Sequence, residues 1–293
     1  MQGARPRGEQ ESQMAREFIT EAENTWCQGC GNFGIMNAMK KAVGLLAERG
    51  VPRSHIAMTA GIGCHAKIFD YMALSGVYSL HGRAMATAQG MKLANPSVKV
   101  VAFCGDGDAF SEGVAHMMHA AKRNSDIAVV VHDNGVYALT TGQRGPTSPR
   151  GFRGPSTPDG NNEDPWKPLV LMLEAGATFA ARGYCGNVDQ LAEIITEAIL
   201  HEGFSFVQVL QPSVTFTNRF EEYNRLVKPL EGGPLGFEEA LALARQEEPL
   251  PAGIFYRSEK EPYEVSVNRG RNPVEDRMSR EDRLRVLAEI LGR

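Results

Sequence analysis

The chain of 293 residues has no long apolar run. Because a transmembrane helix needs a stretch of about 18 apolar residues, we expect no membrane partner. The first 18 residues are polar and lack the apolar centre of a signal peptide. The formal net charge is −4, and no basic run with interleaved aromatic residues occurs. We therefore expect no nucleic-acid partner.

Cysteine is also scarce, with five residues at positions Cys27, Cys30, Cys64, Cys104 and Cys185. An odd number of cysteines in a chain of this length indicates metal or thiol chemistry in a reducing compartment, so we expect a cytoplasmic protein. Cys27 and Cys30 form a C-x-x-C loop flanked by glycine. Such a loop can bind one metal through two thiolates, act as a redox dithiol or have no chemical role.

Helix and strand signals alternate along the chain. Periodic apolar residues predict helices over residues 34–48, 84–93, 111–123, 168–174 and 188–201. Short apolar runs predict strands over residues 56–59, 98–104, 127–131, 178–181 and 204–210. This alternation is typical of an α/β fold with a mostly parallel sheet flanked by helices. The intervening residues 144–165 are rich in Gly, Pro, Ser and Asn, and we expect a long loop that covers an active site or contacts a partner.

The composition divides the chain into three parts. Residues 1–20 are expected to be a flexible tail, residues 21–220 the main domain and residues 221–293 a charged extension. Within the extension, residues 279–291 are predicted to form an amphipathic helix. This helix either packs on a partner subunit or is a solvated helix at the edge of the domain.

The central motif follows two neighbouring predicted strands. Gly105, Asp106 and Gly107 come directly after the first, and Asp133 and Asn134 follow the second. Open parallel sheets bind their ligands at the carboxyl ends of the strands. Oxygen donors such as Asp106 and Asn134 suit Mg²⁺, and the glycines allow a phosphate to approach the backbone closely. The pattern indicates a magnesium-held diphosphate cofactor, although each segment alone could be a surface turn.

The spacing of these residues makes the motif more specific. Residues 108–132, which are 25 positions, separate Gly107 from Asp133. This resembles the thiamine diphosphate signature, in which a GDG is followed some two dozen residues later by a pair of asparagines. Asp133 departs from that pattern, whereas Asn134, which is the metal ligand of the pair, is intact. The resemblance implies the main-chain carbonyl of Val136 as the third protein ligand.

Several blocks together resemble the beta subunit of the 2-oxoacid:ferredoxin oxidoreductases. They are WCQGCGNFGI at 26–35, GIGC at 61–64, SGVYSLHGRA at 75–84, the stretch from GDGD to GVYALTTGQ at 105–143, and VLQPSVTF at 209–216. The resemblance covers residues 24–218 with every block in family order. It implies a thiamine diphosphate-binding fold (the diphosphate domain of thiamine enzymes) with one [4Fe–4S] cluster beside the cofactor. The chain looks most like the 2-oxoglutarate:ferredoxin oxidoreductases.

The same resemblance implies Cys27, Cys30 and Cys64 as cluster ligands, but the fourth position is Ser213, where the family usually has cysteine. Ser213 could ligate through its oxygen, another group or water could cap the fourth iron, or the cluster could be a three-iron form. Cys185 is a possible substitute from a different predicted loop. Cys104 lies on a predicted buried strand, where a cysteine behaves as a small hydrophobe. We expect a four-iron cluster on three thiolates.

The resemblance also implies a cofactor-binding set and two catalytic residues. The cofactor-binding residues are Ile62, Gly63, Cys64, His65, His81, Gly82, Arg83, Ala84, Gly105, Gly107, Asp108, Ala138 and Leu139. His81 could shuttle protons near the reacting carbon, or it could cap a helix or order a loop. Lys67 resembles the cation that pairs with the distal carboxylate of 2-oxoglutarate, although a lysine is more commonly a solvated surface charge.

The implied function is oxidative decarboxylation of a 2-oxoacid, with 2-oxoglutarate expected, to acyl-CoA and CO₂. Electrons pass to ferredoxin, and the reaction could run in reverse to fix CO₂. The implied partners are coenzyme A, ferredoxin and an alpha subunit that supplies the glutamate activating the cofactor, in an αβ or α2β2 assembly. Alternatives are a pyruvate or broad-specificity enzyme of the same family, a non-redox thiamine decarboxylase subunit, and a zinc-stabilised interaction module.

Overall fold

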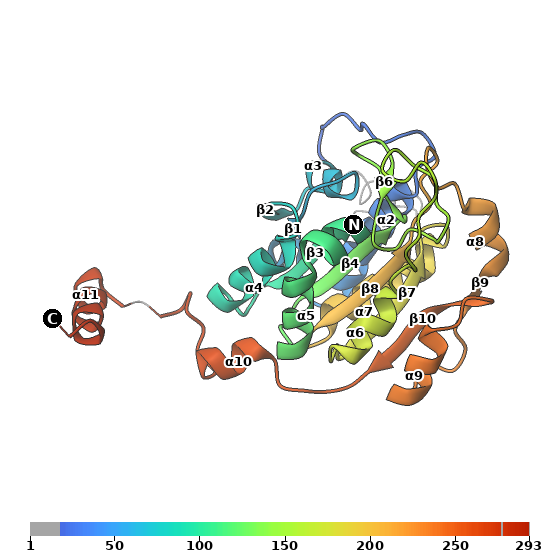
Figure 1. Cartoon of the computed structure of the whole chain (residues 1–293). Helices are drawn as coiled ribbons and strands as arrows, with labels where there is room; N and C mark the ends of the chain where they lie inside the picture. The colour runs from blue at the N-terminus through green and yellow to red at the C-terminus, as the bar shows by residue number, and fades with distance from the viewer. Residues whose placement is uncertain (1–17, 277, 293) are drawn as a thin grey trace, which may run out of the picture.

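The computed structural model describes residues 18–276 and 278–292, and an eight-stranded sheet forms its centre (Figure 1). The strand order is β2-β1-β3-β4-β8-β7-β10-β9. The strands are β1 Ile56–Ala60, β2 Ser75–Tyr78, β3 Lys99–Gly105, β4 Ala128–Asp133, β7 Phe179–Tyr184, β8 Ser205–Leu210, β9 Val227–Pro229 and β10 Leu250–Arg257. All neighbours pair in parallel except β10, which runs antiparallel to β7. The predicted mostly parallel α/β sheet is therefore confirmed.

Helices cover both faces of the sheet. The first face packs against α2 Asn32–Glu48 and α7 Val188–Leu200, and the second against α4 Ala84–Ala94, α5 Val114–Arg123, α6 Pro168–Glu174 and α9 Phe237–Ala244. Because successive side chains of a strand point to opposite faces, Phe103 enters the first core while Ala102 and Cys104 enter the second. This explains why the central strands are apolar throughout.

The remaining elements are short. They are the 3₁₀ turns η1 Arg53–His55 and η2 His65–Lys67, the π-helical turn η3 Asp108–Glu112, the helices α3 Ile68–Tyr71, α8 Phe220–Leu226, α10 Tyr263–Asn268 and α11 Arg280–Ile290, and the antiparallel pair β5 Val136–Tyr137 and β6 Gln143–Arg144. The helix predicted over residues 111–123 is thus divided by Gly113 into η3 and α5. Among the described helices, none has the length and apolar character required to cross a membrane.

The predicted long loop follows β6 and folds over the carboxyl edge of the sheet. Asn161, which is buried, orders this loop from within. Its Nδ2 lies 3.2, 3.1 and 3.0 Å from the carbonyl oxygens of Ser148, Pro149 and Glu163, among which its two N–H groups are shared. These contacts with one buried amide give a segment without regular structure a defined conformation.

The domain boundary predicted at residue 220 was misplaced. Residues 227–257 add β9 and β10 to the same sheet, and α9 between them joins the second core. The charged composition of residues 221–293 gave no indication that β9, β10 and α9 belong to the main domain. Strands at a sheet edge and a helix with one buried face carry many polar residues.

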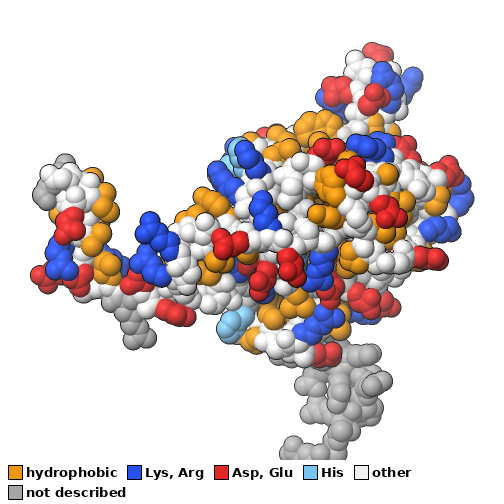
Figure 2. Space-filling view, turned by 90° about the horizontal axis from the view of Figure 1, so that it is seen from below, with side chains coloured by type: hydrophobic (Ala, Val, Ile, Leu, Met, Phe, Trp, Pro, Cys, Tyr) orange, Lys and Arg blue, Asp and Glu red, His pale blue; other side chains and the backbone are white. Residues whose placement is uncertain are grey.

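The two ends of the chain differ from the sheet in their packing. Helix α11 forms where the amphipathic pattern predicted it, capped by the Ser279 hydroxyl, which accepts a hydrogen bond from the Asp282 amide. It lies apart from the sheet with its apolar side chains exposed, so its expected subunit contact stays a prediction (Figures 1 and 2). Of the predicted flexible tail, residues 1–17 lie outside the described residues. The tail's last residues are held, because Ile19 bridges to Met72.

Candidate functional site

The two predicted ligand segments meet at one edge of the sheet. Strands β3 and β4 are parallel neighbours with Gly105 opposite His132, so Asp106 and Asn134 both follow strand ends at this edge. A cavity opens there, which we call the strand-end cavity. Its lining comprises Ile62, Gly63, Cys64, His65, His81, Gly105, Asp106, Gly107, Asp108, His132, Asn134, Val136, Tyr137, Ala138, Leu139 and Thr140. The structure thus brings together residues from segments that span nearly 80 positions of the chain.

Two buried carboxylates lie beside this cavity. The Thr147 hydroxyl is 2.7 Å from Asp106 Oδ2 and 2.8 Å from Asp133 Oδ1. One hydroxyl has one proton, so it can donate to only one of the two at a time. Burial, together with the charge of Asp133, raises the pKa of Asp106. A divalent cation at Asp106 would offset this excess of negative charge.

The residues at the cavity fit a magnesium ion by the chemistry of their donors. Asp106 offers a carboxylate, Asn134 an amide oxygen and Val136 a main-chain carbonyl, and all three residues line the cavity. Asn134 Oδ1 accepts a hydrogen bond from the Val136 amide at 2.9 Å, which holds the side chain next to the Val136 backbone. The set keeps few protein ligands, as Mg²⁺ sites that also bind phosphate do.

Asp133, the departure from the signature, is not among the residues that line the cavity. Its Oδ2 accepts a hydrogen bond from Gln208 Nε2 at 2.7 Å. Gln208 Oε1 in turn accepts from Nε of the buried Arg182 at 3.1 Å. The Asp133 carboxylate is therefore linked to a buried cation through a series of hydrogen bonds. This explains how the protein accommodates a buried charge at position 133.

Asp108 holds the loops around the cavity together. Its Oδ1 accepts hydrogen bonds from the amides of Gly82 at 2.7 Å and Ile62 at 3.3 Å, and lies 3.1 Å from His81 Nδ1. Its Oδ2 lies 3.5 Å from His65 Nε2. Burial alone would raise the pKa of the Asp108 carboxyl, but these contacts outweigh burial and lower it below the ordinary value. The carboxylate thus joins the segments that follow β1, β2 and β3.

The HGRA block contributes to the cavity through one residue and orders the loop through the others. His81 lines the cavity, and its contact with Asp108 raises its pKa although burial opposes this. Arg83 Nη1 donates to the Glu112 carbonyl at 2.9 Å, and the Ala84 carbonyl accepts from Thr59 Oγ1 at 3.0 Å. Gly82, Arg83 and Ala84 therefore position the loop and do not line the cavity.

A second cavity, the cysteine cavity, adjoins the first. Its lining comprises Thr25, Trp26, Cys27, Cys30, Asn32, Cys64, Lys67, Asn134, Ala138, Leu139, Gln211, Ser213, Val214, Thr215 and Phe216. Cys64, Asn134, Ala138 and Leu139 line both cavities, which therefore share a wall. Gln211 Nε2 donates to Cys30 Sγ and Thr215 Oγ1 to Cys27 Sγ, each at 3.7 Å. These donors would stabilise thiolates, which are the form that binds metal.

Ser213 and Cys185 differ in their access to the cysteine cavity. Ser213 lines it, whereas Cys185 does not and belongs to the first core. Burial raises the pKa of Cys185 to about 12, so its thiol stays protonated. A Cβ on Gly31 would lie 2.8 Å from Cys185 Sγ, which shows that the thiol packs beneath the C-x-x-C turn. In residues 18–276 and 278–292 no three His, Cys, Asp or Glu side chains form a group that could hold a metal ion. The thiols share a cavity without yet converging.

Lys67 lies in the cysteine cavity and not in the strand-end cavity. Its Nζ donates to Thr25 Oγ1 at 2.8 Å. Leu139, which is 46% exposed, lies on the shared wall between the two cavities. A ligand that extends past Leu139 from the strand-end cavity would therefore approach the Lys67 ammonium.

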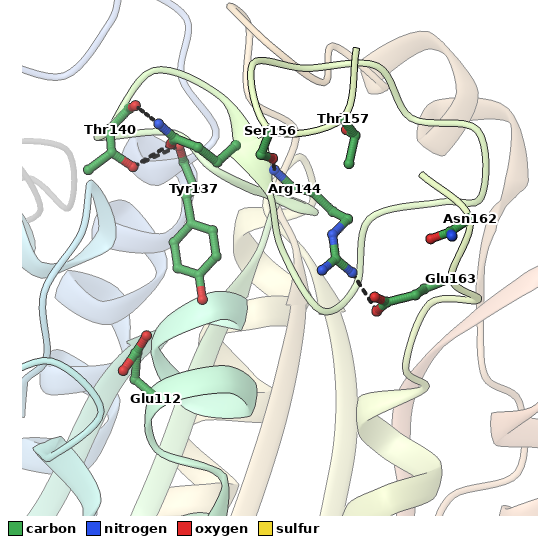
Figure 3. A pocket seen from close by; sticks show the side chains of 9 residues that line it. Glu112, Tyr137, Thr140, Arg144, Ser156, Thr157, Asn162 and Glu163 are labelled. Carbon is green, nitrogen blue, oxygen red and sulfur yellow. Dashed lines mark hydrogen bonds and ion pairs between the residues drawn. The ribbon is translucent and has the colours of Figure 1, made fainter. Parts of the chain in front are cut away.

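A third, polar cavity lies beside the strand-end cavity, between Glu112 at the end of η3 and the long loop (Figure 3). Tyr137 and Thr140 line both. Arg144, on the wall formed by the long loop, pairs with Glu163 across the loop. This cavity provides a polar approach to the strand-end cavity.

The sequence motifs missed several residues that the structure places here. Thr147, on the long loop, had no motif to mark it. His132 directly precedes the Asp133-Asn134 pair, which was its only available signal. Gln211 lies two residues before Ser213 and contacts Asn134 Nδ2 through Oε1 at 3.4 Å as well as Cys30.

Comparisons with known proteins agree on this region. Residues 61–209 match the model of the thiamine pyrophosphate enzyme C-terminal TPP binding domain. The chain is 40% identical over 268 residues to the 2-oxoacid:ferredoxin oxidoreductase subunit beta of Sulfolobus sp, covering 85% of this chain and 87% of that one. It is 39% identical over 206 residues to the 2-oxoglutarate synthase subunit KorB of Methanothermobacter marburgensis, covering 70% of each.

A solved structure resembles the whole fold. It is the 2-oxoglutarate:ferredoxin oxidoreductase from Magnetococcus marinus with 2-oxoglutarate, coenzyme A and succinyl-CoA bound. The TM-score is 0.85 at 34% sequence identity, and the match covers 94% of this chain and 95% of that one.

The role of Asp108 can be tested by stability. Asp108→Ala should lower the free energy of unfolding by roughly 2–3 kcal/mol, because it leaves the buried Gly82 amide without an acceptor and removes two histidine contacts. Thermal and urea unfolding of the purified protein measure this. Asp159→Ala, at an exposed position, is the control and should change little. Equal stability of the two variants would show that Asp108 does not hold the loops together.

Proposed function

The chain belongs to the beta subunits of the 2-oxoacid:ferredoxin oxidoreductases, and on this premise we propose that it acts on 2-oxoglutarate with thiamine diphosphate, Mg²⁺ and a [4Fe–4S] cluster bound. Its matched domain binds thiamine diphosphate. The observation that carries the proposal is the shared wall between the strand-end cavity and the cysteine cavity. Two groups bound there would lie next to each other, as electron transfer between them requires.

In this proposal the strand-end cavity holds the diphosphate. Asp106, Asn134 and the Val136 carbonyl bind Mg²⁺, while Gly105 and Gly107 let the phosphates approach the backbone. When bound, thiamine diphosphate would supply an electron sink for decarboxylation, and a cluster held beside it would supply one-electron chemistry. His81, whose Nδ1 lies beside Asp108, presents an imidazole at the cavity that can hold or release a proton.

The cysteine cavity supplies the cluster ligands. Cys27, Cys30 and Cys64 provide three thiolates, and Ser213 takes the fourth position through its oxygen. The hydroxyl of Ser213 lines this cavity, whereas the thiol of Cys185 is in the core. Of the possibilities left open by the sequence, we therefore favour ligation by Ser213.

Lys67 supports 2-oxoglutarate as the substrate. A ligand bound in the strand-end cavity that extends past Leu139 would place a distal carboxylate near the Lys67 ammonium. A broader range of 2-oxoacids is the second candidate, because the relative from Sulfolobus is named for 2-oxoacids in general.

A beta subunit implies an alpha subunit. The lining of the cysteine cavity includes exposed apolar side chains, with Leu139 46% exposed and Phe216 38% exposed. Apolar surface beside an active site suits a protein partner. We propose that the alpha subunit completes the site here in an αβ or α2β2 assembly, and that ferredoxin and coenzyme A are the further partners.

The bound groups can be measured directly. The purified complex with the alpha subunit should contain thiamine diphosphate and about four irons and four sulfides per beta chain. The double variant Asp106→Ala, Asn134→Ala should lose thiamine diphosphate and activity while the iron remains, because it removes two magnesium ligands and leaves Cys27, Cys30 and Cys64 unchanged. Asp164→Ala, an exposed charge, is the control.

Other compositions would contradict the proposal. Zinc without labile sulfide would indicate an interaction module, and a colourless active complex would indicate a non-redox thiamine decarboxylase. Full activity of the double variant would show that the strand-end cavity is not the cofactor site.

Substrate recognition can be tested at Lys67. Lys67→Leu should lower kcat/KM for 2-oxoglutarate on the order of tenfold to a hundredfold, because a charge-assisted hydrogen bond is lost, and should affect pyruvate far less. Steady-state kinetics with both substrates measure the ratio. Lys41→Leu, a half-exposed lysine on α2, is the control. An unchanged ratio would favour the broader substrate range.

The fourth cluster position can be tested spectroscopically. Ser213→Ala should give a complex with about three irons and a three-iron EPR signal, and Ser213→Cys should retain about four. Val214→Ala truncates a neighbouring side chain in the same cavity and should leave the iron count unchanged. If Ser213→Ala keeps the wild-type iron count and spectrum, another group or water binds the fourth iron.

A further inference from the structure

Among the buried polar atoms near the site that have no hydrogen-bond partner in the described residues are His132 Nε2 and Asn32 Nδ2. Each of these two residues is only 1% exposed. The two side chains are partners of each other through their remaining polar atoms, with His132 Nδ1 2.8 Å from Asn32 Oδ1. Each of the two side chains therefore has one polar atom with a hydrogen-bond partner and one without.

The two ends of this pair belong to different cavities. His132, the fifth residue of β4, lines the strand-end cavity together with His65 and Asn134. Asn32, the first residue of α2, lines the cysteine cavity two positions after Cys30. The hydrogen bond between them thus crosses from one cavity to the other.

The protonation pattern of the pair follows from its chemistry. An amide oxygen only accepts hydrogen bonds, so His132 Nδ1 carries the ring hydrogen and Nε2 presents a lone pair. The opposite end of the Asn32 amide then presents two N–H donors. Cys30, whose thiolate the proposed function makes a cluster ligand, lines the same cavity two positions before Asn32. A reversed amide would turn its oxygen toward that thiolate.

The two unpartnered atoms, His132 Nε2 and Asn32 Nδ2, can bind the groups that the proposed function places in the cavities, which are the cofactor and the iron-bound thiolates. A buried polar group without a partner destabilises the fold unless a ligand supplies the partner. An iron-bound thiolate accepts N–H hydrogen bonds, as Asn32 Nδ2 can provide. A ligand with an N–H or O–H group in the strand-end cavity can donate to His132 Nε2.

We propose that His132 and Asn32 are a positioning pair that links the two cavities. His132 Nε2 accepts a hydrogen bond from an N–H or O–H donor of the ligand in the strand-end cavity, and Asn32 Nδ2 donates to the Cys30 thiolate. The inference rests on the proposed function, since it requires a ligand in each cavity. The donor belongs to thiamine diphosphate, which carries an amino group, because a 2-oxoacid at neutral pH has only ionised carboxylates and a keto oxygen and so has no hydrogen to donate.

The His132 end can be tested in the purified complex with its alpha subunit. His132→Phe keeps a ring against Phe103, and His132→Asn keeps an amide only near the position of Nδ1, so both remove the acceptor at the cavity. His132→Gln places an amide oxygen near the position of Nε2. The first two variants should weaken ligand binding about five- to tenfold, and His132→Gln should restore most of the loss.

Two measurements test this assignment. Equilibrium dialysis with Mg²⁺ should show weaker binding of thiamine diphosphate in His132→Phe and His132→Asn. The KM for 2-oxoglutarate at saturating thiamine diphosphate should stay constant, because that substrate has no hydrogen to donate. Wild-type binding of thiamine diphosphate in both variants, with or without a raised KM, would overturn the proposal.

The Asn32 end has a readout that does not depend on turnover. Asn32→Leu should shift the reduction potential of the cluster to a more negative value at unchanged iron content, because loss of an N–H donor disfavours the more negative reduced state. EPR-monitored redox titration measures this. An unchanged potential in Asn32→Leu would overturn the proposal.

A matched control separates this role from general stability. His201 is another buried histidine, bonded to Thr178 Oγ1 at 2.8 Å near the amino end of β8. His201→Phe should leave ligand binding and the reduction potential of the cluster unchanged. If His201→Phe weakens ligand binding as much as His132→Phe does, the effect of His132→Phe comes from lost stability and the proposal is wrong. A wild-type complex without iron or thiamine diphosphate would instead refute the proposed function itself.

Discussion

The carboxylate of Asp108 is the contact on which the site depends. Parallel strands bring their carboxyl ends to one edge, but the segments that leave those ends are free to diverge. Asp108 joins them, since it accepts hydrogen bonds from the Ile62 and Gly82 amides and contacts His65 and His81. A Cβ at Gly61 would overlap this carboxylate, so the close approach needs glycine. One buried anion thereby sets the distance between the GIGC and HGRA blocks.

A second buried anion, Asp133, is linked through hydrogen bonds to the buried cation Arg182. A chain of contacts runs from Arg182 through Gln208 and Asp133 to Thr147 and Asp106. Arg182 itself packs over Phe255 and donates to the carbonyl oxygens of Ala244 and Pro251. The C-terminal strand β10, which lies far from the cavities, therefore takes part in the electrostatic balance of the metal-binding residues. This gives the antiparallel strand a role beyond extending the sheet.

The sequence predicted the parts of this arrangement that are local. Apolar runs of the right length predicted the central strands, and the GDG and Asp133-Asn134 segments follow two of them because glycine and short polar residues end strands. It did not predict contacts between distant loops. Nothing near Thr147 indicates that its hydroxyl reaches Asp106, and nothing near Asn32 indicates His132 as a partner 100 residues away. The strands β2 and β9 were not among the predicted strands, because they are only four and three residues long and their side chains do not alternate between buried and exposed.

The edge strand β2 has a consequence for the biosynthesis of the protein. All four of its residues are exposed, and its outer side has no neighbouring strand within the described part of the chain. An open backbone edge with Val77 and Tyr78 at the surface is a template for unwanted strand pairing between copies. A cell that made this subunit in excess over its partner would thus be exposed to aggregation. Balanced synthesis of the two polypeptides would protect the edge by keeping unassembled copies rare.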